Sequence, residues 1–233
     1  MAPVSMALRV LQGLGTEDRR RVLEHLRRRT YRSGEVVFHE GDPADSIHFV
    51  VEGRVVARRD SVDGTRLAYV LLGPGEAFGE VGLLTAHRRR STTIEAVEPT
   101  VTMSLSSADF DRLRSAHPGV EALLVQLLVA RVERLTDGLL EALHVPADQR
   151  VARRILDLTG AYDAAATGEV RVPLTQTDLA ELSGVTRPTA NRVLRRLERS
   201  GAVALGRGVL VVRDPVALRR AAGPDHRSPA PRG

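Results

Sequence analysis

We expect an α+β fold with three parts: an N-terminal β-roll of the jelly-roll type, a long helix, and a C-terminal pair of short helices followed by a β-hairpin. Three observations predict it. Short apolar runs broken by turn residues fill most of the N-terminal half, a periodic apolar stretch follows Pro118, and two threonines that suit helix caps then flank a glycine turn.

The N-terminal part begins with a short helix and then changes to strands. Thr16 is expected to cap that helix, and apolar runs from Glu35 to about Ser106 are separated by Gly-Asp-Pro, Glu-Gly, Asp-Gly and Pro-Gly. Asp63-Gly64 lies between two apolar runs, which is a strong hairpin signal. Many short strands with regularly spaced turns are typical of a roll, which we assign to residues 1–116.

The apolar period changes after Pro118. From Val120 to Leu143 the only glycine or proline is Gly138, and apolar residues recur at alternating spacings of three and four. They are Val125, Leu128, Val132, Leu135, Leu139 and Ala142. This pattern is typical of a coiled-coil seam, so residues 117–145 are expected to form a helix through which two copies of the chain pair. The alternative is packing on its own domain, and the apolar face is wide enough for both.

Residues 146–220 are expected to form a winged helix-turn-helix. Thr175 suits the cap of a first short helix, and Asp178 three residues later suits a capping box. Gly184 supplies the positive φ of a tight turn, and Thr186 caps a second helix with Pro188 in its first turn. The apolar residues of that helix share one face: Ala190, Val193, Leu194 and Leu197.

The outer face of the second helix is basic. It carries Arg187, Asn191, Arg192, Arg195 and Arg199, with Glu198 as the one acid in that stretch. This arrangement is typical of a recognition helix in the major groove of double-stranded DNA. Residues 202–214 then read as two strands around a Gly-Arg-Gly turn, a wing with Arg207 at its tip. The residues expected to bind DNA are Thr175, Thr186, Arg187, Pro188, Asn191, Arg192, Arg195 and Arg207.

Two segments are expected to lack regular structure. A helix over residues 148–162 is followed by a polar linker at 163–169. The last residues, 221–233, are rich in proline, glycine and charge, and we expect them to be disordered.

Composition excludes several classes of protein. The chain has 233 residues and no cysteine, which rules out disulfides, thiol nucleophiles and cysteine-held iron–sulfur clusters. No apolar run is long enough to span a membrane, and the N-terminus is a poor signal peptide. We therefore expect a cytoplasmic protein without a membrane partner. The net charge of +5 favours an anionic partner, although every cation is arginine, which weakens the meaning of any single arginine run.

The order of roll, long helix and winged helix-turn-helix resembles the family of the cAMP receptor protein and the fumarate–nitrate reduction regulator (CRP/FNR), over roughly residues 17 to 220. In that family the strand domain carries Gly-Glu and, ten residues after the Glu, Arg-Ser. Here these are Gly79-Glu80 and Arg90-Ser91. The resemblance implies a cyclic-nucleotide-binding domain, a homodimer and RNA polymerase as a further partner.

A cyclic nucleotide suits the chemistry of these residues. Arg90 can hold the anionic phosphodiester with a planar fork, Ser91 adds a hydroxyl, and Glu80 can accept from the ribose 2′-hydroxyl. The backbone N–H groups from Gly79 to Val81 lie where a short helix would begin, which suits an anion. The alternative is a salt bridge between Glu80 and Arg90 in a sensor that has lost its ligand.

By resemblance, the base of the nucleotide meets a hydroxyl pair in the middle of the long helix. Thr136 matches the first position, and Asp137 replaces the second hydroxyl. An aspartate can accept from the exocyclic amine of adenine or guanine. The expected effector is a cyclic purine nucleotide, with cAMP as the first candidate and cGMP as the second.

Other sensor chemistries of the family are not expected. Haem needs an axial ligand, and we interpret His39, His48 and His87 as turn or strand-face residues. We therefore expect no metal, haem or iron–sulfur cluster. An enzyme such as a cyclic-nucleotide hydrolase is not expected either, because the motif offers binding groups without a paired acid and base.

These features predict a ligand-gated transcription regulator that binds a palindromic operator as a homodimer. The alternative is a regulator of the same architecture that senses a different ligand or binds DNA without one.

Overall fold

The computed structural model describes residues 11, 14–60, 66–162 and 169–224. The chain divides into two compact units, residues 1–136 and 137–233, with the division inside the long helix α5 (Pro118–His144). Each unit has its own core and is described by itself.

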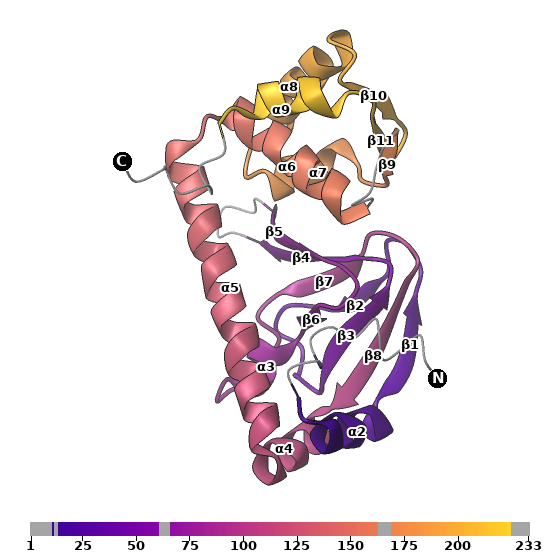
Figure 1. The fold of residues 1–233 in the computed structure, drawn as a ribbon, viewed down its shortest axis with the longest axis vertical. Helices are drawn as coiled ribbons and strands as arrows, with labels where there is room; N and C mark the ends of the chain where they lie inside the picture. The colour runs from indigo at the N-terminus through magenta and orange to yellow at the C-terminus, as the bar shows by residue number, and fades with distance from the viewer. Residues whose placement is uncertain (1–10, 12–13, 61–65, 163–168, 225–233) are drawn as a thin grey trace. The chain divides into compact units, whose positions relative to one another are not determined.

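The first unit is a roll of two four-stranded antiparallel sheets (Figure 1). One sheet has the strand order β1-β8-β3-β6 and the other β2-β7-β4-β5. The strands are β1 (Arg27–Tyr31), β2 (Val36–Phe38), β3 (Ser46–Glu52), β4 (Val55–Asp60), β5 (Arg66–Leu72), β6 (Ala77–Phe78), β7 (Thr93–Ala96) and β8 (Thr100–Ser106). The predicted roll is confirmed. Strands β4 and β5 pair as the predicted hairpin, with Asp60 opposite Arg66, while the predicted Asp63-Gly64 turn lies outside the described residues.

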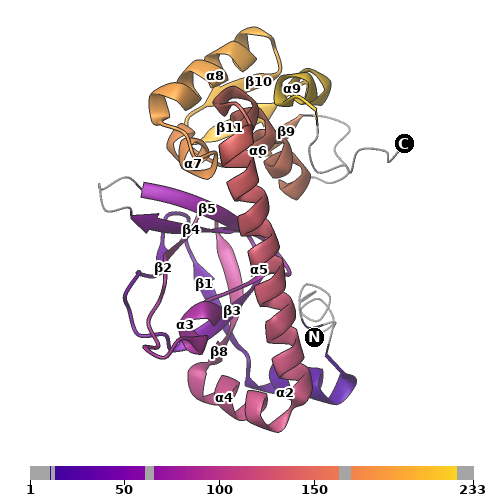
Figure 2. The same ribbon diagram turned by 90° about the vertical axis from the view of Figure 1, so that its left-hand side faces the viewer.

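Two apolar cores hold the roll together, and strand β3 contributes to both. Val50 faces the space between the sheets, where it joins Val55, Leu72, Phe78 and Ile94. Its neighbours in sequence, Ile47 and Phe49, face the other side of their sheet. There they pack with residues of helices α2 (Thr16–His25), α4 (Ser107–Ala116) and the start of α5 (Figure 1, Figure 2). Because side chains alternate along a strand, a run that is apolar at nearly every position is buried on both faces.

Helix α2 corrects one detail of the sequence analysis. Thr16 is the first helical residue and Gly15 occupies the N-cap position, without any side-chain cap. Glu17 and Asp18 in the first turn place negative charge at the helix N-terminus, which is favourable without a cap. Helix α4 was not predicted, although Ser106 and Asp109 have the spacing of a capping box and the Ser106 side chain accepts from the Asp109 N–H.

The second unit is a winged helix-turn-helix, as predicted. Its elements are α6 (Ala147–Tyr162), β9 (Val170–Val172), α7 (Gln176–Leu182), α8 (Arg187–Arg199), β10 (Val203–Gly206), β11 (Val209–Val212) and α9 (Pro215–Ala222). Thr175 and Asp178 form the predicted capping box, and Gly184 has a φ of 60° in the turn. Strand β9 was not predicted, and it extends the wing to a sheet of order β10-β11-β9.

Helix α9 shows that the predicted disordered tail, residues 221–233, begins too early in the sequence. Asp214 caps this helix by accepting from two backbone N–H groups, and Leu218 and Ala222 are buried. Arg153 of α6 donates to the carbonyl of Ala222 at 2.9 Å. Residues 221 and 222 are therefore helical and packed, while residues 225–233, like most of the predicted linker (163–168), lie outside the described part of the chain.

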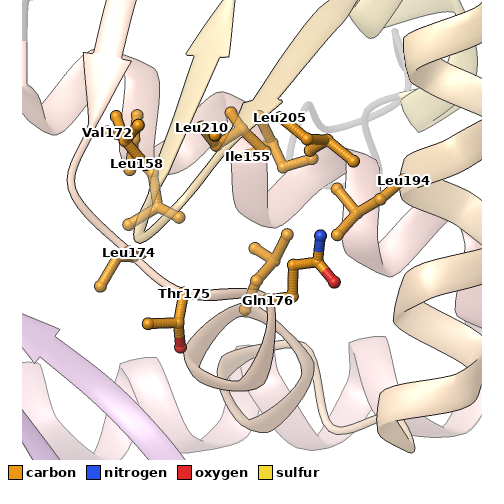
Figure 3. A pocket seen from close by; sticks show the side chains of 12 residues that line it. Ile155, Leu158, Val172, Leu174, Thr175, Gln176, Leu194, Leu205 and Leu210 are labelled. Carbon is orange, nitrogen blue, oxygen red and sulfur yellow. The ribbon is translucent and has the colours of Figure 1, made fainter.

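The core of the second unit is nearly filled. Apolar side chains from α6, β9, α8 and the wing, together with Thr175 and Gln176, line a cavity of about 20 Å³. Figure 3 shows these side chains. Such a space holds no more than a water-sized molecule. This cavity is a packing defect of the core rather than a ligand site.

A single arginine joins the turn of the helix-turn-helix to the end of α5. The Arg150 guanidinium donates to the carbonyls of Val145 at 3.0 Å, Ser183 at 3.2 Å and Gly184 at 3.0 Å. These carbonyls follow the last turns of α5 and α7, where no further helical N–H is present to bind them. Among the described residues, no helix combines the length and apolar character that crossing a membrane requires.

Candidate ligand pocket and DNA-reading surface

A cavity of about 390 Å³ opens in the first unit between the strands and α5. It is lined by Phe38, Arg59, Leu67, Tyr69, Phe78, Gly79, Glu80, Val81, Gly82, Arg90, Ser91, Thr92, Ile94, Arg131 and Leu135. The five residues predicted in the strand domain, Gly79, Glu80, Val81, Arg90 and Ser91, all lie on its wall. Its volume lies within the range of small-molecule sites.

Gly79 allows the close packing at one end of this cavity. It precedes the short helix α3 (Glu80–Leu84) with a φ of 90°, which side chains disfavour. A Cβ atom at this position would lie 2.7 Å from Nη1 of Arg90 and 3.0 Å from the carbonyl oxygen of Ser46. Glycine is therefore required here for both the backbone angle and the position of Arg90.

Arg90 is buried, with 3% of its surface exposed, and its terminal nitrogens already have partners. Nη1 donates to the Ser46 carbonyl at 2.6 Å, and Nη2 donates to Asp45 at 2.7 Å and to the Ser46 hydroxyl at 3.0 Å. The guanidinium carbon lies 3.9 Å from the centre of the Phe38 ring. Burial lowers the pKa of Arg90, while Asp45 acts in the opposite direction. Its Nε is buried without a partner among the described residues.

Glu80 is buried as well, with 2% exposed, and it pairs with a residue that the sequence analysis missed. Arg131 of α5 donates from Nη2 to Oε1 of Glu80 at 3.2 Å. The alternative salt bridge between Glu80 and Arg90 is therefore replaced by two separate ion pairs. Oε2 of Glu80 and Nη1 of Arg131 are buried and lack partners among the described residues.

The predicted base-contacting pair does not line this cavity in the single chain. Helix α5 contributes Arg131 and Leu135 to the wall instead. The Thr136 hydroxyl is exposed and donates to the Val132 carbonyl of its own helix at 2.9 Å. Asp137 is also exposed. A contact between these two residues and a base stays a prediction.

His48 is a buried strand-face residue, in line with its interpretation from the sequence. Its ring stacks on Phe78 at 5.0 Å between centroids, and its nitrogens contact the hydroxyls of Ser46 and Thr102. Burial, together with the nearby charge of Arg90, lowers the pKa of His48 to about 3. The imidazole is therefore neutral at physiological pH. His39 and His87 are exposed.

The recognition helix α8 presents most of its predicted residues to solvent. Arg187, Pro188, Arg192, Arg195 and Arg199 are exposed, whereas Asn191 is half-buried and its Oδ1 has no partner among the described residues. Thr186 caps the helix by accepting from the Thr189 N–H. Arg195 pairs with Glu198 at 3.0 Å. In the wing, the exposed Arg207 occupies the turn between β10 and β11.

Comparisons with known proteins agree with this arrangement. Residues 28–117 match the model of the cyclic nucleotide-binding domain, and residues 149–221 match that of the Crp-like helix-turn-helix domain. The cyclic AMP receptor protein of Thermus thermophilus is 33% identical over 91% of this chain and 96% of its own length. The chain belongs to the CRP/FNR family of transcription regulators.

Further relatives place this CRP/FNR regulator among DNA-binding proteins rather than enzymes. The CRP-like cAMP-activated global transcriptional regulator of Mycobacterium tuberculosis H37Rv is 30% identical over 81% of this chain and 85% of its own length. The solved c-di-GMP responsive regulator CLP of Xanthomonas campestris is 25% identical, with a TM-score of 0.71, over 85% of this chain and 99% of its own. These relatives bear names that specify different effectors.

In this CRP/FNR regulator, α5 has an exposed apolar stripe. Val120, Leu123 and Leu124 are buried in their own unit, as the alternative interpretation of the helix suggested. Large apolar residues further along are more than half exposed: Val125, Val129, Val132, Leu135, Leu139, Leu140 and Leu143. Of the remaining predicted seam residues, Ala142 is exposed and Leu128 is half-buried. Val129, Leu140 and Leu143 were not predicted, because they lie outside the single row of alternating spacings in the sequence.

Proposed function

We propose that the cavity of the first unit binds a cyclic purine nucleotide, cAMP or cGMP, and that this ligand controls DNA binding by a homodimer. The observation that carries the ligand half is a set of three buried polar atoms without partners, all on residues that line one cavity. They are Oε2 of Glu80, Nε of Arg90 and Nη1 of Arg131. Burying an unpaired polar group costs about 1–3 kcal/mol, and more for a charged one. A ligand that supplies one hydroxyl donor and several anionic acceptors would satisfy all three.

A cyclic nucleotide offers those groups. Its 2′-hydroxyl can donate to Oε2 of Glu80, and its phosphodiester can accept from Nε of Arg90 and from the Ser91 hydroxyl. Nη1 of Arg131 provides a further donor. The names of the relatives from T. thermophilus and M. tuberculosis make cAMP the first ligand to test, with cGMP as the second. A different effector, or DNA binding without one, remains the alternative proposal.

The test is the loss of binding in Arg90→Ala. A charge-assisted contact in a partly desolvated site contributes roughly 2–4 kcal/mol, so the variant is expected to bind cAMP or cGMP about 30- to 1000-fold more weakly. Isothermal titration calorimetry measures this. Arg89→Ala is the matched control, because Arg89 is the exposed neighbour and does not line the cavity. Equal affinity in wild type and Arg90→Ala would refute the proposed site.

The second part of the proposal concerns which DNA bases the residues in the first turns of α8 contact. In the family an Arg-Glu pair and a second arginine read the half-site. Arg187 and Arg192 match the arginines, whereas Pro188 replaces the carboxylate. We propose that both arginines read guanine through N7 and O6, and that the base pair between the guanines is read weakly or by Asn191. Paired through α5, two copies would read a near-palindrome with half-sites about 34 Å apart and act on RNA polymerase.

A further inference from the structure

The arginines of recognition helix α8 are partly neutralised by a carboxylate from another helix. Asp148, in the first turn of α6, lies 2.8 Å from Nη1 of Arg196 and 4.0 Å from Nη2 of Arg192. Within α8 itself the one acid, Glu198, pairs with Arg195. Three of the five arginines of α8 therefore face a carboxylate, and two of these three face the same one.

The exposure of these groups shows that the contact does little for folding. Arg192 and Arg196 have 73% and 53% of their side-chain surface exposed, and Asp148 has 36%. Ion pairs this exposed contribute little to stability, because water screens them and both side chains lose freedom. Helix α6 is already held by the buried residues Val151, Ala152 and Ile155. The main effect of Asp148 is therefore on the charge that α8 presents.

We infer that Asp148 is a specificity-determining residue, which weakens binding to DNA of arbitrary sequence more than binding to the operator. Binding to arbitrary sequence depends on arginine–phosphate contacts, and for each such contact Arg192 and Arg196 must leave the carboxylate. When a phosphate takes the place of the Asp148 carboxylate as the partner of these arginines, the nearby negative charge of Asp148 also repels that phosphate. In the operator complex Arg192 points to a base edge, so less phosphate binding is lost. This last step rests on the proposed reading of guanine by Arg192.

The experiment compares the full chain with Asp148→Asn on two DNA duplexes. One is a pool of random sequence, and the other is a site that the wild type selects from that pool. Fluorescence anisotropy is measured between about 50 and 300 mM salt, because the slope of log affinity against log salt counts phosphate contacts. For the variant we expect about 3- to 30-fold tighter binding to the random pool, a salt slope steeper by about one contact and a smaller change on the selected site.

Asp157→Asn is the matched control. It removes the same charge from the same helix, and Asp157 pairs with Arg154 of α6 at 3.5 Å. Equal effects of the two substitutions would overturn the inference, because they would reflect net charge alone. Weaker binding of Asp148→Asn to the random pool would overturn it too, by showing a supporting role. An unchanged ratio between the two duplexes would refute the specificity claim. If the wild type selects no site, the proposed operator fails, whereas the random-pool measurement still decides whether Asp148 limits binding.

Discussion

Glu80 and Arg90 are both buried, and their surroundings compensate their charges unequally. Arg90 has a carboxylate, a carbonyl and a hydroxyl around its terminal nitrogens. Glu80 has one hydrogen bond, from Arg131, and one oxygen without a partner among the described residues. Because a buried charge is costly unless it is fully paired, Glu80 has more to gain from a ligand. The glycine–glutamate and arginine–serine pairs predicted these two positions. Their partners Asp45, Ser46 and Arg131 are 44 to 51 residues distant in sequence, and no local pattern specifies them.

The neutral His48 makes the roll sensitive to acid. The pKa of His48 is about 3 in the folded protein, against about 6.5 in the unfolded chain. The unfolded state therefore takes up a proton between these values while the native state resists it. The free energy of unfolding is unaffected above pH 6.5 or so and falls below it, by up to about 1.4 kcal/mol per pH unit.

We expect His48→Gln to reduce this loss, because glutamine keeps a polar side chain and does not titrate. Urea unfolding at about pH 7 and about pH 5 should show the wild type losing about 1–2 kcal/mol more than the variant. The quantity compared is the change in the free energy of unfolding between the two pH values within each protein. The stability lost with the stacking on Phe78 is present at both pH values and cancels. The same acid sensitivity in both proteins would contradict a buried neutral imidazole.

At the scale of elements, α5, α7 and α8 were predictable from local patterns, whereas helix α4 and the shortest strands were not predicted. The period of α5 and the caps of α7 and α8 carry their own signals, because they depend on residues within a few positions of one another. Strands β6 and β9 have two and three residues, and they exist because a neighbouring strand pairs with them. The extent of the exposed apolar stripe on α5 could not be predicted from the sequence for a different reason. Only burial separates the apolar residues that pack on their own unit from those that do not.

Leu139→Glu is expected to prevent pairing through α5. Leu139 is 60% exposed on the apolar stripe, and a carboxylate there would be buried without a partner in a dimer. The variant should sediment as a monomer at micromolar concentration in analytical ultracentrifugation, with its helix content unchanged. Gln126→Glu is the control, since Gln126 is an exposed polar residue of the same helix. A Leu139→Glu dimer as stable as the wild-type dimer would show that copies pair elsewhere.

At the scale of the whole molecule, one helix supplies residues to both proposed functions. Arg131 and Leu135 of α5 line the cavity, and the apolar stripe runs along the same helix. Arg150 joins Val145, the residue that follows the last turn of α5, to the turn of the helix-turn-helix. A ligand that binds Arg131 therefore contacts the element through which we propose that two copies pair.

The nucleotide and DNA are expected to strengthen each other's binding by the same factor. Linkage requires this equality for any coupling, and coupling factors are typically about 5- to 150-fold. Calorimetric titration of cAMP or cGMP with and without a selected duplex gives one factor, and anisotropy with and without nucleotide gives the other. Tight nucleotide binding with both affinities unchanged would favour the alternative, a regulator that binds DNA without ligand control.

Strand β1 has a consequence for the behaviour of the protein in concentrated solution. Among the described strands it lies at the edge of its sheet, and its first four residues are exposed. Three of them are arginines, Arg27, Arg28 and Arg29. An unpaired edge is a template on which a strand of another molecule can add, and such addition leads to aggregates. Consecutive positive charges repel the same edge of a second molecule, so this strand protects the roll from growing into an extended sheet.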